Sequence, residues 1–149
     1  MDNFIGNIDA KVDNKGRAFV PAEFRKILQT VGDSRLILRK DIFEDCLVLY
    51  PAPVWEAELS AFRSKIKPHR KKDRQAYFKF IQDANLLEMD ASGRILIPKR
   101  YLQIAGINTD VRFIGVDQTI QIWDPYRSEH TEMDDAAFED FMDQLDDDD

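Results

Sequence analysis

The stretch DNKGRAFVPAEF at residues 13–24 occurs a second time in the chain, as DASGRILIPKRY at residues 90–101. Both copies place Asp, Gly, Arg, Pro and an aromatic residue at the same internal spacing, with three apolar residues between Arg and Pro. Two copies at one spacing are far less expected by chance than a single copy. The repeat therefore predicts that the chain is built from two similar halves.

Each copy predicts the same local structure: a strand end, a tight turn, a second strand and a helix. Gly16 and Gly93 can adopt the positive φ that a hairpin turn requires. The residues before Pro21 and Pro98 are biased towards extended backbone. Both prolines suit the first turn of a helix, where a missing N–H costs nothing. We therefore expect the turn and the helix start at equivalent places in the two halves.

The elements around the two copies follow the same order. The first half predicts strands at residues 4–12, 17–20, 35–39 and 46–50 with a helix at 21–31, and the second half predicts strands at 84–89, 94–97, 110–116 and 119–123 with a helix at 98–105. Strands this short do not make a stable sheet within one half. We therefore expect an α+β fold, mainly β, in which the halves share one β-barrel with pseudo-two-fold symmetry.

The repeat also predicts the boundaries of the chain's segments. We expect a first half at residues 1–52, a helical linker at 53–85, a second half at 86–126 and an acidic C-terminal tail at 127–149. Pro68 divides the linker into two helices. In the tail, residues 136–145 have the apolar spacing of a helix, whereas Asp146–Asp149 repel one another and are expected to be disordered.

The net charge of −7 is unevenly distributed. Residues 127–149 hold 11 of the 28 acidic residues and one of the 21 basic residues, which leaves 20 basic and 17 acidic residues in the body. An acidic total is therefore compatible with nucleic-acid binding by the body. The most basic window, Lys65–Arg74, is either a solvated surface or a contact with DNA or with a neighbouring subunit's acids. The tail either aids solubility or competes with DNA.

Several function classes find no support in the sequence. Cys46, the single cysteine, lies in an apolar run and is expected to be a buried small hydrophobe. His69 and His130 lack partners at metal-ligand spacing, and no glycine-rich phosphate loop is present. No apolar run approaches the ~20 residues of a membrane span, and Met1 begins no secretory signal pattern. We therefore expect a cytoplasmic protein that is not an enzyme, without cofactor, metal, small-molecule substrate or membrane partner.

With both copies and the linking helices in view, the sequence resembles the MraZ family of bacterial transcriptional regulators over roughly residues 1–140. The resemblance rests on two Asp-x-x-x-Arg motifs, Asp13 to Arg17 and Asp90 to Arg94, each followed by an apolar residue and proline. It implies a double-split β-barrel related to the AbrB-like swapped-hairpin factors. It also implies a homo-oligomeric ring of about eight to twelve subunits. Its implied role is sequence-specific binding of double-stranded DNA at promoter repeats, repressing a cell-division and cell-wall gene cluster at the nucleoid.

Arg17 and Arg94 are the expected DNA contacts, because arginine forms bidentate hydrogen bonds with guanine edges or with phosphate. Asp13 and Asp90 stand four residues earlier, across each turn, where they can hold the guanidinium in one rotamer and lower the entropy lost on binding. Lys15 adds a charge for phosphate in the first turn, where the second turn has serine. We therefore expect Lys15 and Arg17 to contribute more than Arg94.

A purely structural role for the turns stays open. Asp-x-x-Gly-Arg is a common hairpin turn, and an exposed Asp–Arg pair contributes only ~0–1 kcal/mol. The alternative function is a structural or protein-interaction ring whose turns serve assembly and which binds no specific DNA. DNA binding and the effect of Arg17→Ala on oligomer size separate these two hypotheses.

Overall fold

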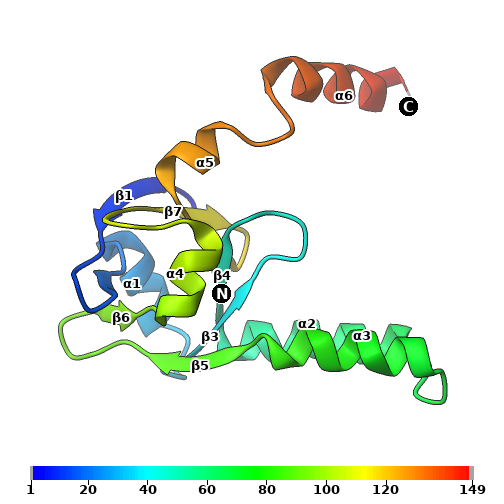
Figure 1. Ribbon diagram of the computed structural model, residues 1–149, viewed down its shortest axis with the longest axis horizontal. Helices are drawn as coiled ribbons and strands as arrows, with labels where there is room; N and C mark the ends of the chain where they lie inside the picture. The colour runs from blue at the N-terminus through cyan, green and yellow to red at the C-terminus, as the bar shows by residue number, and fades with distance from the viewer. Residues whose placement is uncertain (1, 148–149) are drawn as a thin grey trace.

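The computed structural model describes residues 2–147, which form one large antiparallel sheet, a separate two-stranded ribbon and six helices (Figure 1). The first half contributes β1 (Asn7–Lys11), β2 (Arg17–Phe19), α1 (Ala22–Gln29), β3 (Arg35–Lys40) and β4 (Leu47–Pro51). The linker contributes α2 (Ala52–Lys65) and α3 (Lys71–Gln82). The second half contributes β5 (Asn85–Glu88), β6 (Arg94–Leu96), α4 (Lys99–Ala105), β7 (Asp110–Val116) and β8 (Thr119–Trp123), followed by α5 (Pro125–Glu129) and α6 (Asp135–Asp147).

The sheet topology has the two-fold character of the repeat. The strand order is β1-β7-β8-β4-β3-β5, with every neighbouring pair antiparallel. The counterpart strands of the two halves are β1 and β5, β3 and β7, and β4 and β8. Exchanging them gives the order β5-β3-β4-β8-β7-β1, which is the same order read from the other edge. β2 and β6 are also counterparts, and they pair with each other directly. The predicted α+β class and the repeated order of elements are therefore confirmed, and the halves are interleaved rather than side by side. The expectation of a mainly β fold is wrong, because helices hold more of the described residues than strands do.

The expected single barrel does not close among the described residues. β1 and β5 are the free edges of the six-stranded sheet, and β2 and β6 form their own two-stranded sheet. The physical reason lies in the length of β2 and β6, which have three residues each. Pro21 and Pro98 lack the N–H that would extend either strand, and they start helices instead. A single bridge between Val12 and Ala18 connects the ribbon to the chain entering it.

One core serves both halves, between the sheet, the ribbon, α1 and α4. Its largest fully buried side chains come from both repeats and include Phe4, Phe24, Tyr101 and Phe113. Ala18 and Ile95, at 1% and 0% exposure, turn the inner face of the ribbon towards this core. Each fully buried large apolar side chain contributes about 1.5–3 kcal/mol relative to exposure. Neither half can keep these contacts without the other.

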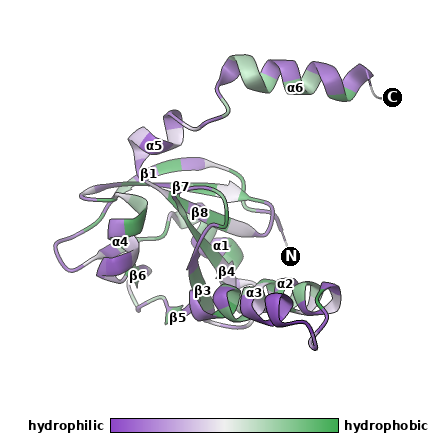
Figure 2. Ribbon diagram, turned by 45° about the vertical axis from the view of Figure 1, so that its right-hand side comes forward, coloured by the Kyte–Doolittle hydropathy of each residue, from purple (hydrophilic) through white to green (hydrophobic). Residues whose placement is uncertain are grey.

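A second, smaller core attaches the α2–α3 helix pair to the outer face of β3 and β4. The rings of Trp55 and Phe80 stack there with centroids 5.3 Å apart, and Tyr50 meets Trp55 edge-on. β4 is buried along its whole length because one core covers each of its faces. In Figure 2 the strands at the centre of the fold are green, whereas the outer side of α3 is purple.

The C-terminal part differs from the expectation in two ways. The sequence patterns did not predict α5, which begins where the Asp124 carboxylate accepts the N–H of Arg127 at 3.0 Å. The helix expected at residues 136–145 is confirmed but extends to Asp147, so the expected disorder is wrong for Asp146 and Asp147. Asp148 and Asp149 lie outside the described residues. No helix within residues 2–147 is long and apolar enough to cross a membrane.

Candidate nucleic-acid interface

The first Asp–Arg turn is closed by the carboxylate of Asp13. Its Oδ1 accepts the backbone N–H groups of Lys15 and Arg17, each at 2.9 Å, and its Oδ2 accepts Nε–H of Arg17 at 2.8 Å. The N–H of Gly16 donates to the Asp13 carbonyl at 3.0 Å. One carboxylate therefore fixes both the backbone of the turn and the direction of the arginine that follows it.

The second turn repeats these contacts. Oδ1 of Asp90 accepts the N–H groups of Ser92 and Arg94 at 2.9 Å, and Oδ2 accepts Nε–H of Arg94 at 2.8 Å. The N–H of Gly93 donates to the Asp90 carbonyl at 3.0 Å. The two turns therefore have the same geometry, with one carboxylate that contacts the backbone of the turn and the arginine after it.

Gly16 is required for the two halves to approach each other. Its φ is +90°, and a Cβ added there would lie 2.7 Å from the carbonyl oxygen of Ile97. The N–H of Ile97 donates to the Gly16 carbonyl at 2.8 Å, and the N–H of Val20 makes the equivalent bond to Gly93 at 3.0 Å. The turns are therefore attached to the strand of the opposite half.

The outer surface of the ribbon carries both arginines. Ala18 pairs with Ile95 in the register, and both side chains point inward. Arg17 pairs with Leu96, and Phe19 pairs with Arg94. Because side chains alternate along a strand, these four lie together on the opposite surface, where Phe19 and Leu96 are 52% and 54% exposed. We call this surface, made of Arg17, Phe19, Arg94 and Leu96, the ribbon face.

Both arginines of the ribbon face keep donors for an external partner. Their side chains are 34% and 28% exposed. Among the contacts of the described residues, each guanidinium donates a hydrogen bond only through Nε, so that Nη1 and Nη2 remain. The backbone N–H of Arg17, helped by its guanidinium, holds the pKa of Asp13 below its usual value, and Arg94 does the same for Asp90. Both carboxylates therefore stay ionised at neutral pH and keep their arginines oriented.

Arg25 flanks the second turn and was not found by sequence reasoning. Its Nη1 donates to the Val20 carbonyl at 2.6 Å, and its Cδ would lie 2.6 Å from a Cβ placed on Gly93. The equivalent neighbour of Gly16 is the apolar Leu102, whose Cδ1 would lie 3.5 Å from a Cβ on that glycine. Position-by-position alignment of the two copies pairs Arg25 with Leu102 and could have revealed this difference.

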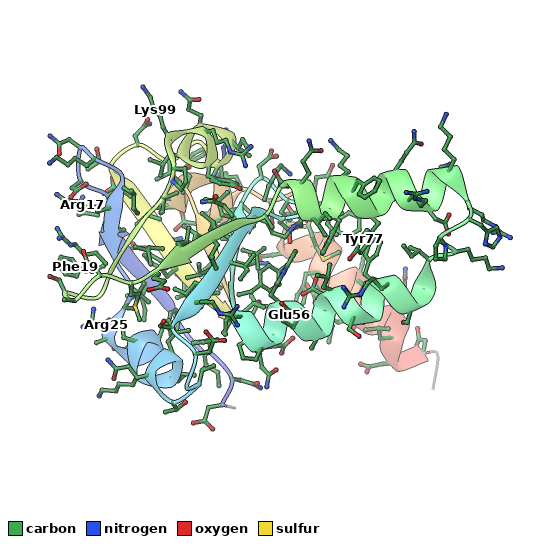
Figure 3. The ribbon with its side chains drawn as sticks, turned by 90° about the horizontal axis from the view of Figure 1, so that it is seen from below. Arg17, Phe19, Arg25, Glu56, Tyr77 and Lys99 are labelled. Atoms are coloured by element: carbon green, nitrogen blue, oxygen red, sulfur yellow. The ribbon has the colours of Figure 1, made fainter. Side chains whose placement is uncertain are left out.

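Lys99 flanks the first turn and was also missed. It begins α4, whose start lies beside the first turn, and it is exposed. The equivalent position at the start of α1 is Ala22. Arg100 turns away from this edge, since its Nη2 donates to the hydroxyl of Tyr101 at 2.8 Å. Figure 3 shows Lys99, Arg17, Phe19 and Arg25 along one edge of the body, at the far end from the α2–α3 helix pair. The first-turn end of this edge is therefore the more cationic one.

The other candidate residues do not join this edge. The basic window Lys65–Arg74 lies at the tip of the α2–α3 pair, where the Asp73 carboxylate accepts the N–H of Lys67 at 2.8 Å. Cys46 is buried, and burial raises the pKa of its thiol to about 12, so it is no nucleophile at neutral pH. Within residues 2–147, no group of three or more His, Cys, Asp and Glu side chains is placed to hold a metal.

Fold and site together define a class: small α+β proteins in which a duplicated hairpin presents carboxylate-held arginines on a short exposed ribbon. A family model described as "MraZ protein, putative antitoxin-like" matches residues 80–148. The Transcriptional regulator MraZ of Bacteroides fragilis is 51% identical over 138 residues, which cover 93% of this chain and 87% of the relative. The Transcriptional regulator MraZ of Bacteroides thetaiotaomicron is 48% identical over 138 residues, which cover 93% of this chain and 88% of the relative. The one from a Thermoanaerobacter species is 35% identical over 148 residues, which cover 96% of each chain. The chain belongs to the MraZ family.

Proposed function

We propose that the protein is a transcriptional regulator that binds double-stranded DNA by inserting its ribbon face into the major groove. One observation carries the proposal: two exposed arginines, Arg17 and Arg94, stand on one surface, each oriented by a carboxylate and each with both Nη groups available. The names of the relatives, which are transcriptional regulators, support the same class of function.

The dimensions and chemistry of the ribbon suit this groove. The major groove of B-DNA admits a two-stranded β-ribbon, and arginine pairs bidentately with the O6 and N7 acceptors of guanine. Nη1 and Nη2 of Arg17 are available for such a pair because Asp13 occupies only Nε. Phe19 and Leu96 are exposed apolar groups beside the arginines and can contact thymine methyl groups or sugars. Fixing each guanidinium beforehand reduces the entropy lost on binding.

We propose that Arg17 contributes more than Arg94. Lys15 lies in the first turn and Lys99 lies beside it, where both can contact phosphates. The second turn has Ser92 in place of Lys15, and only Arg25 adds charge there. The same DNA backbone is therefore attracted more strongly to the Arg17 end.

A three-residue ribbon spans few base pairs, so sequence-specific binding by one subunit would be weak. We propose that a ring of about eight to twelve subunits engages successive promoter repeats and gains affinity by avidity. The resemblance adds the repression of a cell-division and cell-wall gene cluster, at the nucleoid in the cytoplasm. The interleaved halves and the separate ribbon support an opened form of the double-split barrel.

The test is a fluorescence-anisotropy titration of a duplex from the promoter of the protein's own gene cluster, beside a scrambled duplex. Arg17→Ala should weaken specific binding by roughly 5- to 150-fold, the equivalent of losing about 1–3 kcal/mol at one base. Arg35→Ala is the matched control, because Arg35 also pairs with an aspartate, Asp33, at 2.7 Å but lies on β3.

Two results would contradict the proposal. Wild-type affinity in Arg17→Ala would remove the ribbon face from the DNA contact. No DNA binding by the wild type at physiological salt, with a changed oligomer in Arg17→Ala by light scattering, would favour the structural ring instead.

A further inference from the structure

α6 has an apolar face that no other part of residues 2–147 covers. Its sequence, DAAFEDFMDQLDD, has six acidic and no basic residues. The apolar side chains Phe138, Phe141, Met142 and Leu145 recur at the i, i+3, i+4, i+7 spacing of one helix face and are 44–55% exposed. No residue of α6 is buried. A helix of this length gains most of its stability from packing an apolar face, so α6 as described is missing a partner.

A groove on the body has the complementary character. It lies between α3, the loop after β3 and the start of α4, and its volume is about 690 Å³. Its apolar lining includes Phe62, Phe80 and Ala76, and its basic lining includes Arg39, Lys79 and Arg100. The groove therefore offers apolar contact along its length and positive charge at several points.

Arg39 adds a buried positive charge beneath the groove, with Tyr50 and Glu58 as its polar neighbours. It is 95% buried, its guanidinium lies 4.3 Å from the centre of the Phe80 ring, and its Nε has no hydrogen-bond partner among the described residues. The two acids that line the groove are already engaged. Asp83 accepts the N–H of Lys40 at 3.2 Å, and Asp41 accepts the N–H groups of Phe43 and Glu44 at 3.0 and 2.9 Å. Lys79 and Arg100 are exposed and form no ion pair among the described residues, so both can meet an external carboxylate.

We propose that α6 of one subunit docks into this groove of a second copy of the chain. The apolar face of α6 would pack on Phe62 and Phe80, and the acidic residues beside it would meet Lys79 and Arg100. Both features are on every chain, so each subunit gives one helix and receives one. Such a contact is heterologous, and repeated copies generate a ring or an open array rather than a closed pair.

The helix of the same chain is not placed to fill the groove. Figures 1 and 2 both show α6 on the opposite side of the body from the α2–α3 pair. α5 is held to the body by Arg127, whose Nη1 donates to the Ile104 carbonyl at 3.2 Å, and by Arg112, which pairs with Glu129 at 2.9 Å. These contacts fix the point from which α6 leaves. The exposed faces of helix and groove can then meet most simply between copies.

The test uses cysteine cross-linking between two populations of the full chain. One carries Met142→Cys on α6 and the other Ala76→Cys in the groove; Cys46 is buried and serves as an unreactive background. After mixing, a short bis-maleimide should link one chain of each kind into a species of twice 17.4 kDa. Ala57→Cys is the matched control, because Ala57 is exposed on α2 but does not line the groove. Its yield with Met142→Cys should be several-fold lower.

A charge exchange gives a second readout. The first double variant, Lys79→Glu and Arg100→Glu, changes the groove, and the second, Asp140→Lys and Asp143→Lys, changes α6. Each double variant should lower the mass of the assembly measured by light scattering. A chain that carries all four substitutions should recover at least half of the lost mass. Equal cross-linking by Ala57→Cys, or an unchanged mass in both charge variants, would overturn the proposal. Cross-linking only within a single chain that carries both Met142→Cys and Ala76→Cys would also overturn it, in favour of docking within one subunit. Binding of a duplex with a single repeat should be the same with Asp140→Lys and Asp143→Lys, which separates this inference from DNA recognition.

Discussion

The guanidinium carbon of Arg94 lies 5.8 Å from the centre of the Phe19 ring, its partner in the register across the ribbon. Arg94 belongs to the second repeat and Phe19 to the first, so each half supplies the surroundings of the other half's arginine. The symmetric position places Leu96 opposite Arg17, where no aromatic ring is present. Arg94 is therefore held by a carboxylate and a ring, whereas the described contacts of the Arg17 guanidinium are with its carboxylate, and its side chain is the more exposed of the two.

The charge difference between the turns predicts different salt dependences. Lys15→Ser should weaken binding to all duplexes by a similar factor and reduce the slope of log affinity against log salt by about 1, because one phosphate contact is lost. Ser92→Lys should increase the slope by about 1. Anisotropy titrations at several salt concentrations measure both. Lys72→Ser, at the exposed tip of the α2–α3 pair, should leave the slope unchanged.

If the turn carboxylates orient the arginines, removing the charge of one should lower the specificity of DNA binding. Asp13→Asn keeps an acceptor for the backbone N–H groups of the turn but loses the charge that holds Nε of Arg17. The guanidinium then samples more rotamers, so the ratio of promoter to scrambled-duplex affinity should fall several-fold. Removing a negative charge should at the same time raise the affinity for the scrambled duplex. An unchanged ratio, like that expected for Asp33→Asn, would contradict an orienting role for Asp13.

The parts of the fold that depend on local spacing could be predicted from the sequence. The Asp–Gly–Arg–Pro order is a property of adjacent residues, and it correctly located both turns, both short strands and the starts of α1 and α4. The pairing of β2 with β6 could not be predicted, because it joins Ala18 to Ile95 across most of the chain. The same long separation concealed Phe19 and Leu96 as members of the ribbon face.

Two further differences have local causes that the sequence patterns did not show. Arg25 was assigned to an ordinary helix, and only the folded chain places its side chain over Gly93. A helix was expected at residues 136–145, with disorder from Asp146 onward. The Asp134 carboxylate accepts the N–H of Ala137 at 2.9 Å, and Asp135 lies in the first turn, where negative charge is favourable. These contacts begin α6, which then continues to Asp147.

Three glycines have a similar positive φ but different surroundings, so their replacement by alanine should lower the free energy of unfolding by different amounts. Gly32 has a φ of +78° and no atom within 4 Å of an added Cβ, so Gly32→Ala should cost only the backbone strain, about 1 kcal/mol. Gly93→Ala should cost about 1–2 kcal/mol, because the Arg25 side chain it meets can move. Gly16→Ala meets the Ile97 carbonyl, a backbone group just after β6 that cannot move aside as a side chain can, and should cost about 3 kcal/mol or more. Urea unfolding measures the order, and a smaller loss for Gly16 than for Gly32 would contradict it.

The turn carboxylates also predict how stability depends on pH. The pKa of Asp13 and that of Asp90 are lowered in the folded protein, chiefly by the backbone N–H groups of Arg17 and Arg94, and the Arg35 guanidinium lowers the pKa of Asp33 to about 2. Because the unfolded chain then binds protons more readily, this stabilisation is complete above the ordinary value of 3.8 and is lost as pH falls through the folded pKa values.

Thermal melts should therefore give a nearly constant contribution from these groups between about pH 7 and 5 and a decline below about pH 4. The double variant Asp13→Asn and Asp90→Asn cannot titrate at the turns, so its Tm should start lower at pH 7 and fall less steeply in acid. Asp33→Asn tests the third carboxylate independently, because its pair with Arg35 lies away from the ribbon. If the double variant and the wild type lost the same number of degrees between pH 5 and pH 3, the carboxylates would not be closing the turns that hold Arg17 and Arg94 in place.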